Sequence, residues 1–349
     1  MATTFKTLTT NDVANTRTLL HEAIPLTGTI ASGTYDDNNI KTFSHGMFES
    51  VYDYPYLSSS ANHIFDLTHG YAADSDLSSS TAIQNSKKIN IYNQMAQVLV
   101  GYDATGSILA FDQDGDIAAG GTKHNEVFFV NFSRLLTKDE IKKGSFTIDF
   151  LTGGTPSART DTMTIGDYGA ITSYKVNSPA GEYGILYTSS ATPNSASGVG
   201  LLYYQAGVAV LTGSIFGGID GTPADKSSMG PGFASGTYDA LATGSNIDVV
   251  ANSLRNRLVN IGFNNTVELN SSVYFCRAGH NDFNYSNNPT YLTASQIRVK
   301  NSTTDTPVSY ITTIGLYSAD NELLAVAKLS EPLQKDPSTE LTLRVRLDY

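Results

Sequence analysis

The most concentrated group of chemically capable side chains in the sequence is a run of three aspartates at alternate positions, Asp112, Asp114 and Asp116. Alternating carboxylates are typical of calcium-binding loops. A loop of the EF-hand type that began at Asp112 would need glycine at its sixth position and glutamate at its twelfth, where this sequence has Ile117 and Lys123. The Asp-Gly step inside the run favours a tight turn instead. We therefore expect a turn here and no metal site.

The histidines do not form a metal-binding pattern either. His63 and His69 are six residues apart, which would place both on one face of a strand, but no third ligand lies nearby in the sequence. None of the histidine pairs has the i, i+4 spacing of a helical zinc site, and the nucleophile-elbow, phosphate-loop and dinucleotide fingerprints are absent. We expect no catalytic residue, no cofactor and no enzymatic activity.

A stripe of alternating aromatic residues, Tyr52, Tyr54 and Tyr56, is the first candidate binding surface. Tyrosines on one face of a strand could stack on sugar rings or pack against a partner protein. Pro55 lies within the stripe, and proline restricts a strand to a sheet edge or an irregular conformation. We interpret the three tyrosines as core residues or subunit contacts in preference to a glycan site.

The second candidate surface is the last strand-like segment, residues 341–347. Its leucines and valine alternate with Arg344 and Arg346, so that one face is apolar and the other forms a basic ridge on an acidic protein. The ridge is either a solvated face or a contact between subunits. The segment itself either completes this subunit's own sheet or pairs with the sheet of a neighbour.

The only cysteine, Cys276, lies between bulky apolar residues, which indicates a buried and inert thiol. A single cysteine excludes an intramolecular disulfide and a zinc site built from several cysteines. The first residues lack the apolar segment of a signal peptide, and no apolar run is long enough to cross a membrane. We expect a protein that is made and assembled in a reducing cytoplasm and does not contact membranes.

The composition also excludes a nucleic-acid partner. The 349 residues carry a formal net charge of −11 and show no basic patch, whereas phosphate binding requires one. Charged residues make up 16% of the chain, below the roughly 25% that is usual in soluble domains. Serine, threonine, asparagine, glycine and tyrosine replace them, which favours strands, turns and surfaces that pack against other proteins.

The elements that position these candidate residues are predicted to be mainly strands. Helical spacing of apolar residues, or a capping box in the third case, predicts short helices near residues 11–24, 86–100, 137–144 and 246–260. Apolar, β-branched and aromatic runs predict strands at 126–132, 145–151, 183–188, 200–212, 267–277, 297–300, 310–317, 323–329 and 341–347. Glycine- and serine-rich segments predict loops at 152–165, 188–199 and 217–245.

The predicted fold class is therefore mainly β, or β-rich α+β, with sandwich-like antiparallel sheets and a few short helices. We expect a mixed N-terminal domain at 1–150, a loop-rich middle region with one helix at 151–262, and a C-terminal β module at 263–349. Within the module, residues 310–329 form two nearly continuous apolar runs. Such runs imply burial on both faces, either by a domain core or by a neighbouring subunit.

Ten stretches of the chain share a likeness to one class of known proteins: residues 19–23, 45–48, 50–57, 88–96, 132–140, 274–278, 282–291, 310–317, 321–328 and 341–349. They resemble virion structural proteins of contractile-tailed phages that infect marine cyanobacteria. The hairpin from Ile-Gly-Leu-Tyr at 314–317 to Leu-Ala-Val-Ala at 324–327 is also similar to one in phage tail-collar fibre proteins. The likeness covers most of the chain and is weakest in the loops at 152–165 and 217–245.

The resemblance implies a structural subunit of a tail, baseplate or neck, located in the virion and assembled in the host cytoplasm. Its expected partners are copies of itself and other virion proteins. A receptor- or glycan-binding tail fibre, or adhesin, is the main alternative, because of the tyrosine stripe and the long loops. A capsid decoration protein is a further alternative. A virion-borne glycan hydrolase would require paired carboxylates, which a sequence alone does not place in space.

Overall fold

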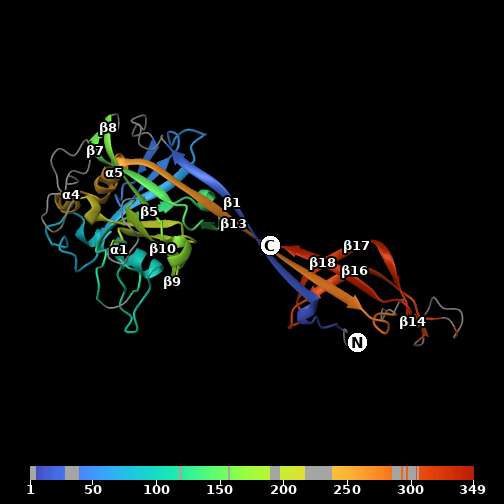
Figure 1. Ribbon diagram of the computed structural model, residues 1–349. Helices are drawn as coiled ribbons and strands as arrows, with labels where there is room; N and C mark the ends of the chain where they lie inside the picture. Colours follow the sequence, from blue (N-terminus) through green and yellow to red (C-terminus); the bar gives the residue numbers. More distant parts are fainter. Residues whose placement is uncertain are drawn as a thin grey trace. The chain divides into compact units, whose positions relative to one another are not determined.

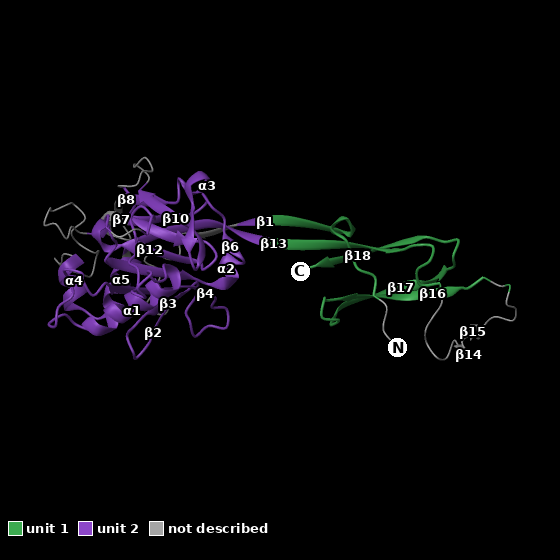
Figure 2. Ribbon diagram, turned by 90° about the horizontal axis from the view of Figure 1, so that it is seen from below, with its two compact units in different colours: residues 1–19, 268–349 green, residues 20–267 purple. Residues whose placement is uncertain are grey.

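The computed structural model describes residues 5–27, 39–117, 120–155, 158–188, 197–216, 238–284, 292–293, 296–297, 304 and 306–349. The chain divides into two compact units, shown in Figure 2. Unit 1 contains residues 1–19 and 268–349, and unit 2 contains residues 20–267. In the described part of the chain, far more residues lie in strands than in helices, so the predicted mainly β fold is confirmed. Among the described residues, no helix is both long and apolar enough to span a membrane.

Unit 2 is built around a large antiparallel sheet with helices packed on it (Figure 1). It also contains the end of β1 (Val13–Thr27) and the beginning of β13 (Leu258–Ala278). Its other elements are β2 (Ile40–Thr42), β3 (Glu49–Tyr52), β4 (His63–Tyr71), α1 (Asn85–Leu99), β5 (Glu126–Phe132), α2 (Arg134–Thr137), β6 (Glu140–Ile141), β7 (Thr147–Thr155), β8 (Ala158–Gly166), α3 (Ala170–Ser173), β9 (Lys175–Ser178), β10 (Gly181–Thr188), β11 (Gly200–Tyr203), β12 (Val208–Thr212), a 3-10 turn (Gly213–Phe216), α4 (Tyr238–Gly244) and α5 (Ile247–Arg257).

The central strands β5, β10, β11 and β12 are buried on both faces, which explains their continuous apolar character. The sheet order runs β8-β10-β11-β12-β5-β4-β3-β2. In β5, Val127 and Phe129 belong to one apolar cluster, whereas Phe128, Val130 and Phe132 belong to the other. Successive side chains therefore enter opposite cores, as the period of a strand requires.

Each of the two cores has its own cover. Helix α1 contributes side chains to the cluster that contains Val127 and Phe129. Helices α4 and α5 and strands β7 and β8 contribute to the cluster that contains Phe128. The strand β4 approaches α1 closely at Gly70, where a Cβ atom would lie 2.8 Å from the main-chain oxygen of Lys88. A side chain at position 70 would therefore separate the helix from the sheet. The result is a helix layer, a central sheet, and a second layer of strands and helices.

The two longer predicted helices are confirmed. The helix predicted at 86–100 is α1, and it ends at Gly101, which has a positive φ of 96°. The helix predicted near 246–260 is α5, whose apolar residues Ile247, Val250 and Leu254 are buried. Strands were expected at 126–132 and 145–151, and they correspond to β5 and to the beginning of β7. The predicted strand at 200–212 is a hairpin of two strands, β11 and β12.

Two predictions within unit 2 are wrong. The capping-box pattern does not begin a helix, because α2 ends at Thr137 and the following Glu140–Ile141 pairs with β13. Ile141 is fully buried by this pairing, which outweighs the local helix preference. The segment 152–165 is not a loop but most of the β7–β8 hairpin, in which Ile148 lies opposite Ile165.

Unit 1 is composed almost entirely of strands. Its elements are a 3-10 turn (Thr10–Asp12), the beginning of β1 (Val13–Thr27), the end of β13 (Leu258–Ala278), β14 (Leu292–Thr293), β15 (Gln296–Ile297), β16 (Ser309–Tyr317), β17 (Leu323–Lys335) and β18 (Leu341–Asp348). The helix predicted at 11–24 is wrong, since this segment is a strand neighbouring β13. Asn15, for example, accepts a hydrogen bond from Ser272 at 2.7 Å. A partner more than 200 residues away in the chain decides its conformation.

The division into units differs from the three regions expected from the sequence. The cores of unit 2 combine residues from both sides of position 150, such as Phe128 and Leu202. Unit 1 combines the first residues of the chain with the C-terminal segment because β1 and β18 both neighbour β13. Of the predicted loop 217–245, residues 217–237 lie outside the described part of the chain, and α4 occupies 238–244.

Candidate interaction surfaces

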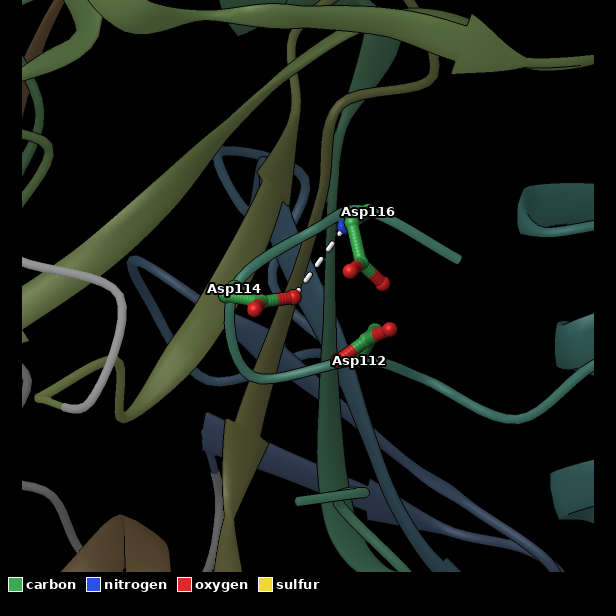
Figure 3. A group of neighbouring side chains, drawn as sticks. All are labelled: Asp112, Asp114 and Asp116. Carbon is green, nitrogen blue, oxygen red and sulfur yellow. Dashed lines mark hydrogen bonds between the residues drawn. The ribbon is translucent and has the colours of Figure 1, made fainter. Parts of the chain in front are cut away.

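The three aspartates form a turn, as expected (Figure 3). Asp112 pairs with Lys123 across the start of the turn, and the main-chain N–H of Asp116 donates to Asp114 Oδ1 at 3.2 Å. Burial raises the pKa of the Asp112 carboxyl, and the Lys123 ammonium lies 2.6 Å from its Oδ2 atom. The carboxylates offer oxygens within 4.8 Å of one another. The lysine already supplies a cation to the most buried of them, so we assign no metal to this turn.

The two histidines of β4 have separate partners. His63 lies 2.8 Å from Asp66, and this hydrogen bond raises its pKa. His69 is completely buried, with Nε2 at 2.8 Å from the hydroxyl of Tyr238 on α4. Burial lowers the pKa of His69 to about 3. The His69 contact connects β4 to α4, whereas the partner of His63 belongs to β4 itself. Both contacts indicate a structural role for the imidazole.

A polar hollow lies beside the end of β5. His124 and Glu126 line it together with Thr212 and Ser214. Burial lowers the pKa of His124 to about 4 and raises that of Glu126, which accepts a hydrogen bond from Ser75. His124 Nε2 has no hydrogen-bond partner among the described residues. His124 is therefore held in its neutral form in this hollow, which makes unit 2 sensitive to acid.

A buried lysine that the sequence patterns did not single out ties the helices of unit 2 together. Lys88 of α1 is 0% exposed. Its ammonium donates to the main-chain oxygens of Ile83, Ala242 and Ser245 at 2.7, 2.6 and 2.8 Å. Three acceptors match the three N–H donors of the ammonium form. Burial lowers the pKa of Lys88 to about 8, and the three bonds offset the lost hydration.

The tyrosine stripe is not a strand face. β3 ends at Tyr52, whose ring packs edge-on against His63, and Tyr54 and Tyr56 lie in the loop that follows. Asp53 and Asn62 close this loop through a main-chain hydrogen bond of 3.1 Å and two side-chain bonds. Compact loops with joined ends are frequently functional. Both loop tyrosines are exposed at its surface.

The C-terminal strand has the predicted alternation. Val345 is buried, its apolar neighbours Leu343 and Leu347 are half-buried, and Arg344 and Arg346 are exposed. β18 completes the subunit's own sheet by pairing along β13, with Cys276 opposite Leu343. Its other edge has no strand partner among the described residues. The strand can therefore complete its own sheet and also pair with the sheet of a neighbour, because one edge is paired and the other is available.

The two arginines differ in their surroundings. Arg346 donates to Asp348 at 2.7 Å and to Ser271 at 3.1 Å. No hydrogen bond or ion pair joins the side chain of Arg344 to another described residue, so its charge faces solvent. Arg344 is thus the better position at which to test the ridge, since a substitution there breaks no internal contact.

Cys276 is half-buried, and not fully buried as expected. Burial, together with the nearby Asp12, raises the pKa of its thiol. Because the thiolate is the reactive form, we expect maleimide to label native Cys276 more slowly than the same thiol in urea-unfolded protein. Equal rates in the two states, followed by mass spectrometry, would show that unit 1 does not protect this residue.

The β16–β17 hairpin of unit 1 has an exposed apolar face. Val326 lies opposite Gly315, and the rings of Tyr317 and Phe5 pack with centroids 4.8 Å apart. A Cβ atom at Gly315 would lie 2.8 Å from the Tyr317 ring and 3.3 Å from Leu323, so the glycine gives both side chains room on this face. We name the four apolar residues the hairpin patch: Phe5, Tyr317, Leu323 and Val326. Each is 41–53% exposed.

Unit 1 has almost no apolar interior. In its described part, the buried apolar side chains are Val273, Ala278 and Val345, whereas both large apolar clusters lie in unit 2. The most buried side chain of the hairpin is Lys335, which bonds to the side chain of Asn284 at 2.6 Å and to main-chain oxygens. An isolated hairpin is only marginally stable in water, and a unit of this size normally needs a core.

Comparison of the chain with protein-family models, with curated proteins and with solved structures found no match.

Proposed function

We propose that the chain is a structural protein of a virus particle, a subunit of a phage tail, baseplate or neck that acts through protein–protein contacts. The observation that carries the proposal is the apolar, coreless surface of unit 1. Strands with this much exposed aliphatic and aromatic surface are typical of chains that are completed by a neighbour. The sequence resemblance supports the same role. The proposal includes no catalytic step, no cofactor and no nucleic-acid or membrane partner.

The exposed loop at 53–62 offers a second surface for such contacts. Leu57 at its tip is 86% exposed, and Tyr54 is exposed beside it. An exposed leucine next to an aromatic ring suits an apolar protein partner better than a sugar, which needs hydrogen-bonding groups around the ring. The loop therefore favours a protein contact over the alternative of a glycan-binding adhesin.

The proposed function is tested by mass spectrometry of purified, salt-washed particles of the phage that encodes the chain. We expect the chain as a stoichiometric component of the tail fraction. Its presence in extracts of infected cells together with its absence from washed particles would contradict the proposal. Recovery with capsids that lack tails would favour a capsid decoration protein.

The basic ridge provides a second test, because reversal of its charge leaves the apolar face of β18 intact. We expect Arg344→Glu to change the free energy of unfolding by less than about 0.5 kcal/mol, as is usual at exposed positions without partners. If the ridge is a subunit contact, the variant should enter particles at a greatly reduced level. A control is Lys87→Glu, at an exposed lysine of unit 2 whose ammonium donates only to the main-chain oxygen of His45. Normal incorporation of Arg344→Glu would rule out the ridge as an assembly contact.

A further inference from the structure

The outer face of the β16–β17 hairpin has a charge order that is complementary to itself. Asp320 and Glu322 lie in the turn at its tip, next to the hairpin patch. Lys328 lies on the other side of the patch, two residues beyond Val326 and therefore on the same face of β17. All three charged side chains are exposed. The face thus runs from acidic through apolar to basic.

This order fits a second copy of the same face turned by 180°. In a two-fold interface the same surface is used by both subunits, so each residue of one copy meets its complement in the other. The patch of one copy would cover the patch of the other. At each end, the lysine of one copy would lie beside the two acidic residues of the other, which fixes the direction of pairing.

The charge distribution over the chain favours the same partner. Unit 1 contains nine Lys and Arg residues and ten Asp and Glu residues, whereas unit 2 contains 13 and 23. Two copies of the chain repel one another strongly through their acidic units and very little through unit 1. A second copy is also present wherever the first is made, so a cover for the patch does not depend on any other protein.

We propose that two copies of this chain associate antiparallel through the outer faces of their β16–β17 hairpins, with Lys328 of each copy opposite Asp320 and Glu322 of the other. The inference rests on the proposed function, because it names the first contact of a subunit that assembles with its own kind. The association supplies unit 1 with the apolar interior that its own residues do not form. The loop at 53–62 and the ridge at Arg344 remain available for other virion proteins.

The patch is tested by measuring the mass of the intact chain in solution by light scattering after gel filtration. We expect a dimer for the natural sequence. Val326→Glu places a charge in the centre of the interface and should weaken the dissociation constant roughly 100-fold or more. The control is Val98→Glu on α1, at a valine of unit 2 that is also exposed, and this variant should remain dimeric. A monomeric natural protein, a trimer, or a dimeric Val326→Glu variant would overturn the inference.

The pairing direction is tested by exchanging charges between two variants. Lys328→Glu alone and Asp320→Lys with Glu322→Lys should each be weak dimers, because like charges then meet at both ends. A mixture of the two should form a heterodimer, since every lysine again faces acidic residues. A mixture that stays monomeric would contradict the antiparallel arrangement. Circular dichroism spectra matching that of the natural protein establish that the variants are folded.

These outcomes separate the inference from the proposed function. A chain that is monomeric in solution but abundant in washed particles overturns the pairing and leaves the structural role in place. A chain that is dimeric in solution but absent from particles overturns the structural role and leaves the pairing in place. Cys276 gives an independent readout within unit 1: maleimide should label it faster in Val326→Glu than in Val98→Glu, because unit 1 loses its cover.

Discussion

Replacement of Lys88 by methionine is expected to destabilise unit 2 by about 3–5 kcal/mol. Methionine approximates the volume of the lysine stem but donates no hydrogen bond. The main-chain oxygens of Ile83, Ala242 and Ser245 would then be left without this donor inside the protein. A buried acceptor that loses its partner costs about 1–3 kcal/mol. Urea unfolding of the variant, followed by far-ultraviolet circular dichroism, measures the loss.

The neighbouring lysine provides the matched control. Lys87 is exposed, and its ammonium donates only to the main-chain oxygen of His45 at 2.9 Å. Lys87→Met should therefore cost less than about 1 kcal/mol, as expected for one exposed hydrogen bond. Equal losses in the two variants would show that the three bonds of Lys88 do not hold the helices together.

Acid should destabilise unit 2 through its two buried histidines. The pKa values of His69 and His124 are lowered from 6.5 to about 3 and about 4, so between pH 6.5 and 4 the unfolded chain binds protons that the folded chain does not. The free energy of unfolding of unit 2 is thus not reduced by these histidines above pH 6.5, and it declines as the pH falls below that value. The decline is about 1.4 kcal/mol per pH unit for each histidine.

Substitution of one of them isolates this effect. His124→Gln should lose about 3 kcal/mol less stability than the natural protein between pH 6.5 and pH 4, given its folded-state pKa of about 4. The raised pKa values of Glu126 and Asp167 act in the opposite sense but do so in both proteins. Urea unfolding at neutral pH corrects for any effect of the substitution itself. Identical pH dependence in the two proteins would show that His124 is not held neutral.

Local patterns were sufficient to predict elements whose buried residues repeat at the regular spacing of a strand or a helix. Phe146, Ile148 and Phe150 alternate in the sequence and all three are buried, because a strand with one face in a core must repeat every second residue. The helix α1 was predictable because its apolar residues recur at the spacing of a helix. In β18 the alternation also placed Arg344 and Arg346 correctly on the outer face.

Features that depend on distant parts of the chain were not predictable. The first strand pairs with β13, and no local pattern could indicate that partner, so residues 11–24 resembled a helix. The burial of Lys88 was not predictable either, because two of its acceptors lie more than 150 residues away in the chain. The two apolar runs of the hairpin were visible, but whether a core or a neighbour covers them depends on unit 1 as a whole.

A cryo-electron microscopy map of the intact particle tests the central claim most directly. The account predicts that unit 1 is buried between neighbouring chains, with Tyr317, Leu323 and Val326 packed against the same residues of a second copy. The side chain of Arg344 should lie at a contact with another virion protein. A map in which the β16–β17 hairpin projects into solvent with its apolar face uncovered would contradict the account.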